Sequence, residues 1–467
     1  MRLYDFLAEA GAHGKVPFHM PGHMRSASRF DWIAPFAPID FTEIDGLDDL
    51  HAPEGILRDA MERAALRFGA ERTFFLVGGS TVGILASVTA VCRRSGRAHP
   101  TLLLARNCHK SVWHAALLNR ASLRFVQPEI HPLGFCLDVK PEAVRAAMET
   151  GGRPDAVIVT SPTYDGVVSD IAGIAEVCHR AGVPLIVDAA HGAHLGFLDP
   201  AVPSPVACGA DLTVMSPHKT LPSLTQTGLL HAREAFADLA AECLDLYETS
   251  SPSYPLMASI DGCVAAMGDP SLFVQWRARI DELRAAAGNL FVKPAGVFAF
   301  DESKLILTMK GISGPETAAL LRQEYNIEPE MVSAKYVLLM TGAGTGRRHV
   351  DALTPFLERF RERGRRFSDE PLPAPALPEP AMRMDEAMRR TAEIVPPEEA
   401  EGRIAATVVT VYPPGIPLAV PGERIDRRVI EAIRENPAGG GRVLLSRGTF
   451  EGGLPVLAEE EDREDRQ

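Results

Sequence analysis

Short apolar runs alternate with amphipathic stretches from about residue 55 to residue 265, and no other feature limits the fold as strongly. Strands separated by helices are typical of an α/β fold whose mostly parallel sheet is covered on both faces. In such sheets, ligands bind where strands end and helices begin. The expected strands are Thr73–Val77, Thr101–Ala105, Ala156–Thr160, Pro184–Val187 and Leu212–Met215, and the expected helices include Pro141–Met148 and Gly173–Ala181.

The chain has 467 residues, too many for one ordinary core, and its pattern changes along its length. A Pro-rich stretch is typical of a stiff linker, and the acidic tail is expected to be disordered. The predicted units are an N-terminal segment that contributes to the site (1–54), a large domain (55–268), a smaller α/β domain (269–367, with strands at Lys304–Met309 and Tyr336–Thr341), a linker (368–382) and a C-terminal α+β domain (383–467, with a β-rich run at Ala405–Val411).

Composition excludes several classes of protein. The formal net charge of −13 argues against sequence-independent binding to nucleic acid, which needs clustered Lys and Arg, and it is compatible with a cationic substrate. Seven scattered cysteines without a C-x-x-C motif indicate neither a disulfide framework nor a zinc module. The N-terminus lacks the apolar core of a signal peptide, and no run suits a membrane helix. We therefore expect a soluble, cytoplasmic protein.

An apolar strand that ends in an acid runs from Val183 to Asp188. This places a carboxylate at the carboxyl edge of the sheet, where it can hold a pyridinium nitrogen protonated, so that the ring accepts electrons. A helix N-cap or a metal ligand is the plainer interpretation, and this segment alone favours it.

The next strand ends in Ser216-Pro217-His218-Lys219. A lysine that forms a Schiff base must be held rigidly and kept partly neutral, and Ser216 and His218 are suitable donors to a neighbouring phosphate. An ordinary surface loop explains this segment equally well. Asp188 and Lys219 on successive strand ends nevertheless support each other, because one molecule of pyridoxal phosphate (PLP) would contact both.

Two more polar turns follow expected strands. Gly78-Gly79-Ser80-Thr81 leads into a helix, so its backbone N–H groups and the helix dipole suit a phosphate. His109, in Arg106-Asn107-Cys108-His109, has a ring that suits stacking on a cofactor. Each turn is weak alone, since Gly-Gly-Ser turns and helix-capping clusters are common.

With these residues in place, the chain resembles the Orn/Lys/Arg decarboxylase family of fold type I PLP enzymes, in its short bacterial form without an N-terminal receiver-like domain. Eight ordered motifs make the resemblance far more specific than any one of them. They are Pro17–His23, Thr42–His51, Asn107–Ser111, Ser161–Gly166, Asp188–His191, Ser216–Lys219, Thr249–Tyr254, and Tyr412–Pro417 with Pro421–Glu423.

The resemblance implies a PLP-binding large domain and a role for each matching residue. Lys219 would hold PLP, Asp188 would pair with the pyridine nitrogen, and His109 would stack on the ring, with His191 close to the opposite face. The phosphate would be bound by Ser80, Thr81, Ser216 and His218. Glu423 would face the cationic end of the substrate, while Tyr254, His19 and His23 would shape a pocket at a dimer interface.

The activity implied is decarboxylation of arginine, lysine or ornithine to the corresponding amine of polyamine metabolism and CO₂, with arginine slightly preferred. The protein would be a homodimer or a larger homo-oligomer. Four positions depart from the family pattern, and we expect them to affect PLP affinity or specificity. They are Gly78, Val82 and Ile84 in the phosphate turn and Met24 near the site entrance.

Other interpretations were weighed against this one. We expect no metal site, because His19-x-x-x-His23 crosses a Pro-Gly and no Cys or acid completes the set around His191-x-x-His194. Cys108 lies beside His109 and could be a nucleophile, but a free cysteine is more often a small buried residue. An aminotransferase would need an arginine for the α-carboxylate, for which Arg322 and the pair Arg347-Arg348 are the candidates. A non-catalytic regulatory paralogue is the last alternative.

The acidic run Glu43, Asp45, Asp48 and Asp49 predicts a solvated or interface loop.

Overall fold

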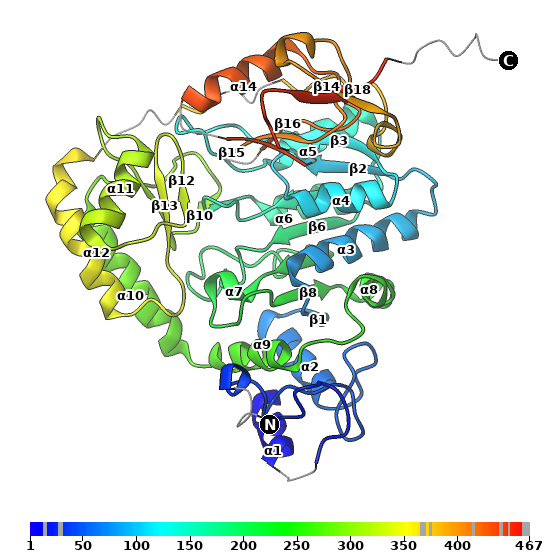
Figure 1. Ribbon diagram of the computed structural model, residues 1–467, viewed down its shortest axis with the longest axis vertical. Coiled ribbons are helices and arrows are strands. Elements are labelled where there is room, and N and C mark those ends of the chain that lie inside the picture. The colour runs from blue at the N-terminus through cyan, green and yellow to red at the C-terminus, as the bar shows by residue number, and fades with distance from the viewer. Residues whose placement is uncertain are drawn as a thin grey trace.

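A computed structural model describes residues 1–12, 16–26, 31–364, 370–372, 376–412, 416–438, 442–446 and 449–459. A central sheet with helices on both faces forms the body of the molecule (Figure 1). A smaller α/β unit lies beside this body, a C-terminal unit covers one end, and the N-terminal segment lies at the other end (Figure 1). No helix among the described residues is long and apolar enough to cross a membrane.

The central sheet has seven strands. Neighbouring strands from β3 to β7 pair in parallel, whereas β8 is antiparallel to both of its neighbours. Their order is β1 (Arg72–Leu76), β8 (Gly228–Ala232), β7 (Leu212–Met215), β6 (Leu185–Ala189), β4 (Ala156–Thr160), β2 (Thr101–Ala105) and β3 (Ser122–Val126). The predicted α/β class is confirmed, and all five expected strands are present to within two residues at each end.

Both faces of the sheet are buried, as near-continuous apolar strands require. Alternate residues of one strand enter different cores: Leu185 and Val187 pack in one cluster and Ile186 in the other. The covering helices are α2 (Ile56–Phe68), α3 (Gly79–Ser95), α4 (Lys110–Leu118), α5 (Pro141–Gly151), α6 (Ile171–Arg180), α7 (Pro217–Thr220), α8 (Glu234–Tyr247) and α9 (Tyr254–Ala266).

The smaller unit pairs its strands antiparallel in the order β12-β13-β11-β9. A two-stranded contact between β10 and β5 joins this unit to the central body next to the strand ends. The elements are α10 (Pro270–Ala287), β9 (Phe291–Val292), β10 (Ala299–Phe300), β11 (Lys304–Leu307), α11 (Gly314–Tyr325), β12 (Met331–Val332), β13 (Val337–Met340), α12 (Arg347–Phe360) and η2 (Arg361–Arg363), with β5 at Val167–Val168.

The C-terminal unit contains two small sheets, β14-β18 and β16-β15-β17. The Pro-rich segment before it is anchored at two described points, because Leu372 pairs with Ile130 and Pro380 with Glu423. The elements are α13 (Met384–Ala387), β14 (Ala392–Val395), η3 (Pro397–Glu399), β15 (Val409–Tyr412), β16 (Ile416–Ala419), α14 (Arg427–Ala438), β17 (Arg442–Leu445) and β18 (Leu454–Leu457). Most of the acidic tail, residues 460–467, and Pro413–Gly415 lie outside the described residues.

In the N-terminal segment, α1 (Leu3–Ala12) packs on α9, while η1 spans Asp31–Ile33. The acidic run that follows is a structural loop at Asp48. Its carboxylate accepts the N–H groups of Gly55 and Leu57, each at 2.8 Å, and so satisfies the free donors at the start of α2. These hydrogen bonds hold the pKa of Asp48 below its usual value, against the opposing effect of burial.

Candidate active site

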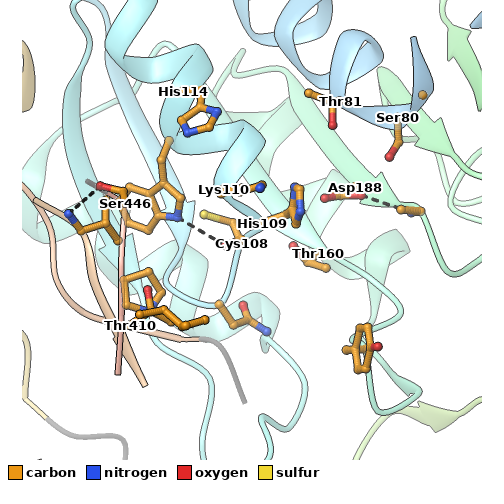
Figure 2. Close-up of a pocket in the computed structure, with 18 of the residues that line it drawn as sticks. Ser80, Thr81, Cys108, His109, Lys110, His114, Thr160, Asp188, Thr410 and Ser446 are labelled. Atoms are coloured by element: carbon orange, nitrogen blue, oxygen red, sulfur yellow. Dashed lines mark hydrogen bonds between the residues drawn. The ribbon is translucent and has the colours of Figure 1, made fainter. Parts of the chain in front are cut away.

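A cavity of about 1100 Å³ opens at the carboxyl ends of the parallel strands. It lies between the central body and parts of the C-terminal unit, and Figure 2 shows Thr410 and Ser446 on one side of it and Ser80, Thr81 and Asp188 on the other. Seven of the twelve predicted site residues line it, and an eighth, Ser216, precedes His218 and Lys219 in the same turn. The seven are Ser80, Thr81, His109, Asp188, His191, His218 and Lys219.

Lys219 lies on α7, directly after β7, and its amine belongs to the cavity wall. Burial lowers the pKa of Lys219, while the negative charges of Asp188 and Glu330 oppose that shift. A lysine with a lowered pKa has a larger neutral fraction, which is the nucleophilic form. The cavity therefore holds an amine suited to a Schiff base.

Asp188 ends β6 and is 4% exposed. Its Oδ1 accepts the backbone N–H of Ala190 at 3.1 Å, and the side chain also lines the cavity. Thr160, at the end of the adjacent strand β4, carries a buried hydroxyl without a hydrogen-bond partner among the described residues. Polar groups at this edge are thus held in place with hydrogen-bonding capacity left over, as a polar ligand requires.

The glycine turn forms the start of α3. Gly79 has φ +77°, a left-handed conformation that favours glycine, and Ser80 and Thr81 occupy the first turn of the helix at the cavity (Figure 2). Free backbone N–H groups at a helix start attract anions. Two departures from the family pattern in this turn, Gly78 and Val82, belong together. A Cβ added at Gly78 would lie 2.5 Å from Val82 Cγ2, so the valine side chain occupies the space that a larger residue at position 78 would need.

His109 precedes α4 and caps it, since its Nδ1 lies 2.9 Å from Ser111 Oγ and accepts the Ser111 N–H at 3.2 Å. Both contacts orient the imidazole, and Figure 2 shows it beside Asp188. Burial lowers the pKa of His109. The negative charge of Asp188 opposes this shift, and the positive charge of Lys219 adds to it. The ring is therefore a fixed, mainly neutral aromatic surface at the cavity.

Ser216 and His218 differ in how they meet the cavity. Ser216 is fully buried, and its hydroxyl has no hydrogen-bond partner among the described residues. His218 donates its Nδ1–H to the carbonyl of Thr227 at 2.7 Å, which leaves Nε2 for another contact. Burial lowers the pKa of His218, which means that protonating its ring costs free energy. Contact between a protonated Nε2 and a phosphate would have to offset that cost.

Sequence reasoning missed a buried lysine behind His191. Lys304 begins β11 of the smaller unit, is fully buried, and places its Nζ 2.9 Å from His191 Nδ1 and 3.3 Å from Met340 Sδ. Burial lowers the pKa of Lys304 to about 8. A lysine in the otherwise apolar run Lys304-Leu305-Ile306-Leu307 was the signal that could have revealed it.

Two acids near this lysine were also missed. Asp165 lines the cavity, accepts a hydrogen bond from the Tyr336 hydroxyl at 2.6 Å, and has its pKa raised by burial to about 6. Glu330 accepts the Tyr164 hydroxyl at 2.6 Å, and the Tyr164 ring in turn meets His191 edge-on at 4.9 Å. Asp165 of the central body thus lies at the cavity itself, and Glu330 of the smaller unit is connected to the cavity wall through Tyr164.

Glu423, which was predicted to face the cationic end of the substrate, is not among the residues that line the cavity of its own chain. Its two carboxylate oxygens accept hydrogen bonds from Arg106 NH1 and NH2, each at 2.8 Å, and Oε2 also accepts the Val420 N–H at 2.9 Å. Both residues are at most 3% exposed. Because a buried Arg needs a carboxylate, Glu423 is committed to holding the C-terminal unit against the turn after β2.

Tyr254, His19 and His23 also lie away from the cavity of the chain that carries them. Tyr254 is fully buried and donates its hydroxyl to the carbonyl of Asp48. His19 Nδ1 contacts the carbonyl of its neighbour Met20, and His23 Nε2 lies 3.1 Å from Asp40 Oδ2. Within one chain, these residues order the N-terminal segment rather than the predicted pocket.

The residues named for other activities are occupied elsewhere. Arg322 pairs with Glu328, and Arg347 with Glu282 and Asp351, all on the surface of the smaller unit. Burial raises the pKa of Cys108, so its thiol stays protonated. Neither an arginine clamp from these positions nor a reactive thiolate is present at the cavity.

The residues around the cavity fit PLP. A lysine amine, a carboxylate at a neighbouring strand end, a helix start with a glycine turn and a fixed imidazole surround one space. The unpartnered hydroxyls of Thr160 and Ser216 add polar capacity that the protein alone does not use. A planar, anionic pyridine derivative can satisfy these groups together.

Comparison with known proteins agrees with this chemistry. The family model described as Orn/Lys/Arg decarboxylase, major domain, matches residues 2–286, and that of the C-terminal domain matches residues 364–435. An arginine decarboxylase of Bacillus subtilis (strain 168) is 33% identical, with 98% of this chain and 95% of that protein covered. The lysine decarboxylase LdcA of Pseudomonas aeruginosa is 25% identical over 79% of this chain and 65% of that protein.

Solved structures show the same fold. The constitutive lysine decarboxylase of Escherichia coli superposes with a TM-score of 0.80 at 20% identity, covering 98% of this chain and 82% of that one. The predicted fold type I architecture is thereby confirmed, and the smaller and C-terminal units are included in the match. This chain belongs to the Orn/Lys/Arg decarboxylase family, and it is a decarboxylase by that membership.

Proposed function

We propose that this protein uses PLP to decarboxylate a basic L-amino acid, with arginine as the substrate, and forms an amine of polyamine metabolism. The observation that carries the proposal is the convergence of Lys219 and Asp188 on one cavity, at the ends of two adjacent parallel strands. The preference for arginine rests on the arginine decarboxylases of Bacillus, which match this chain over nearly its whole length, whereas the lysine decarboxylase LdcA matches less of it.

When bound, PLP supplies an electron sink for the pair of electrons that the departing carboxylate leaves behind. Lys219 would hold the cofactor and would supply an amine that can move a proton. Asp188 would keep the pyridine nitrogen protonated, and His109 would support one face of the ring. The start of α3, with Ser80 and Thr81, would bind the phosphate, together with Ser216 and His218.

The cationic end of the substrate needs an acid other than Glu423. We assign this contact to Glu330, which is not itself part of the cavity lining but accepts a hydrogen bond from Tyr164, a residue of the cavity wall, and whose charge opposes the lowering of the Lys219 pKa. Glu330 is exposed, so its charge is available to a guanidinium that enters the cavity.

We propose further that the working protein is a homo-oligomer, at least a dimer, in which the N-terminal segment contributes to the pocket of a second copy. Large apolar side chains on that segment are strongly exposed in one chain: Phe18 is 93% exposed and Trp32 76% exposed. Such exposure is typical of a surface that another chain covers. His19 and His23 lie on the same segment, which is how they would reach a pocket.

The test is to load the purified protein with PLP and measure CO₂ release from arginine, lysine and ornithine. We expect release from arginine, and Lys219→Ala should abolish both this release and the visible absorption of lysine-bound PLP. No absorption at saturating PLP would contradict the proposal. Consumption of an amino-group acceptor without CO₂ release would identify an aminotransferase instead.

The substrate contact is tested separately. Glu330→Gln should raise KM for arginine roughly tenfold with a smaller change in kcat, because it removes a charge that binds the substrate before and during reaction. Glu328→Gln is the matched control, since that neighbouring acid pairs with Arg322 outside the cavity. Equal KM values for the two variants would remove Glu330 from the site.

A further inference from the structure

Lys304 and His191 form a buried titratable pair that the proposed mechanism does not use. Lys304 comes from the smaller unit and His191 from the turn after β6, so the pair crosses the boundary between two parts of the chain. The ion pairs of the described residues include no carboxylate at Lys304 Nζ, although the side chain is fully buried. A buried ammonium with an imidazole and a thioether as its contacts is costly and therefore calls for a functional explanation.

The direction of the hydrogen bond fixes the form of His191. An ammonium has three donors and no lone pair, so Lys304 can only donate, and Nδ1 of His191 must accept. In a neutral imidazole, the hydrogen then resides on Nε2. Since His191 lines the cavity, this ring presents an N–H donor there.

The surroundings of Nε2 agree with this assignment. Among the described residues, no hydrogen bond uses His191 Nε2, and this atom is not among the buried polar atoms that lack a partner. It is therefore open to the cavity. The edge-on contact with Tyr164, at 4.9 Å between ring centres, limits rotation of the imidazole on its other side.

Charges around the pair keep Lys304 protonated and His191 neutral. Asp301, Glu330 and Asp165 favour the ammonium of Lys304, against burial and the positive charge of Lys219. Burial and then Lys304 lower the pKa of His191 well below its usual value.

The remaining groups that face the pair act in the same direction. Lys219, His194 and His109 also disfavour a positive charge on His191. His194 is paired with Asp301 at 3.0 Å, and Tyr336 is hydrogen-bonded to Asp165, so neither competes for Nδ1.

We propose that Lys304 is a positioning residue that holds His191 as its neutral Nε2–H form, with that N–H directed at the bound cofactor and substrate. The inference rests on the proposed PLP site, which it deepens. A fixed donor at this place stabilises negative charge that develops next to it, and it costs no reorientation during the reaction. Without Lys304, either ring nitrogen can carry the hydrogen, and the ring can also become cationic.

The first test needs no cofactor or activity. In protein labelled with nitrogen-15 at histidine, the imidazole signals of His191 are assigned by their loss in His191→Gln. We expect the Nε2–H pattern near neutral pH in the wild type, and a mixture of forms with a higher pKa in Lys304→Met. Thr341→Val is the control, because it removes a buried hydrogen bond to Trp276 in the same unit without touching His191. An unchanged His191 signal in Lys304→Met would overturn the inference.

The second test uses the loaded enzyme. Loss of an orienting partner of a histidine costs about 10–100-fold in activity, so Lys304→Met should lower kcat by at least about tenfold. The acidic limb of the pH profile of kcat for Lys304→Met should move to higher pH. Without Lys304 the pKa of His191 rises, so that His191 becomes cationic at a higher pH than in the wild type. KM should change little. The control Thr341→Val should leave the pH profile in place. A Lys304→Met profile that superimposes on the wild type would contradict the proposal.

A pair of variants at His191 decides the matter even if Lys304→Met does not fold. A glutamine amide reaches about as far as Nε2, whereas an asparagine amide reaches only as far as Nδ1. We expect His191→Gln to retain about tenfold more kcat than His191→Asn. Equal activity, or the reverse order, would overturn the inference. If the wild type releases no CO₂ from any basic amino acid, the proposed function fails while the nitrogen-15 result still judges Lys304.

Discussion

Two buried cations link neighbouring units to the central body, and they are satisfied in opposite ways. Arg106 meets Glu423 of the C-terminal unit through two hydrogen bonds of 2.8 Å and lies 4.5 Å from the centre of the Phe125 ring. Lys304 of the smaller unit meets His191 and a thioether. The first contact is a complete ion pair, typical of a structural role. The second leaves a charge without a direct counter-ion beside the reacting groups, which is typical of a functional one.

The largest expected effect is on the complete pair. Glu423→Gln should lower the free energy of unfolding by about 3–5 kcal/mol, because it leaves the Arg106 guanidinium buried without a full charge partner. Denaturant unfolding of the loaded protein measures this. Exchanging both partners, as Arg106→Met with Glu423→Leu, should restore much of the loss.

The same variant can break the comparison. If Glu423→Gln keeps its stability while KM for arginine rises, Glu423 binds substrate, as the family resemblance implied. The contrast between a structural and a functional cation would then disappear. A control at Glu451, which is exposed, should change neither quantity.

A smaller effect, with the opposite sign, is expected at Lys304. Because burial lowers the pKa of Lys304 from 10.5 to about 8, the folded state binds fewer protons than the unfolded state between those values. Wild-type stability relative to Lys304→Met should therefore rise as pH increases through this window, by up to about 3 kcal/mol. Below the window the methionine variant should be the more stable protein. Urea unfolding of both proteins at several pH values measures the difference, and a flat difference would show that folding does not lower the pKa of Lys304.

The sequence predicted the site where chemistry follows regular structure. Asp188 and Lys219 were found because the carboxyl ends of neighbouring parallel strands share one edge, which needs only strand positions. Lys304 was not recognised as a site residue, and the Arg106 partner of Glu423 was not foreseen, because the partners of Lys304 and Glu423 lie 113 and 317 residues away in sequence. Lysine in a strand usually means exposure, and only the packed fold shows that this one is buried. Strand β8 was missed for a related reason: it reverses direction after β7 and does not follow the alternating pattern.

The smallest expected effect is at an apolar contact between Gly78 and Val82, and it extends the comparison between structural and functional contacts. At the phosphate turn, Gly78 and Val82 share a space, and an added Cβ would meet both Val82 Cγ2 at 2.5 Å and Glu248 Oε1 at 2.9 Å. Gly78→Ala should lower stability by about 1–3 kcal/mol through overpacking and weaken PLP binding. Adding Val82→Ala should recover much of both, as measured by thermal unfolding and PLP titration. Recovery of stability without recovery of PLP affinity would mean that Gly78 serves the phosphate through its backbone, and that this turn, like Lys304, is held for function at the expense of packing.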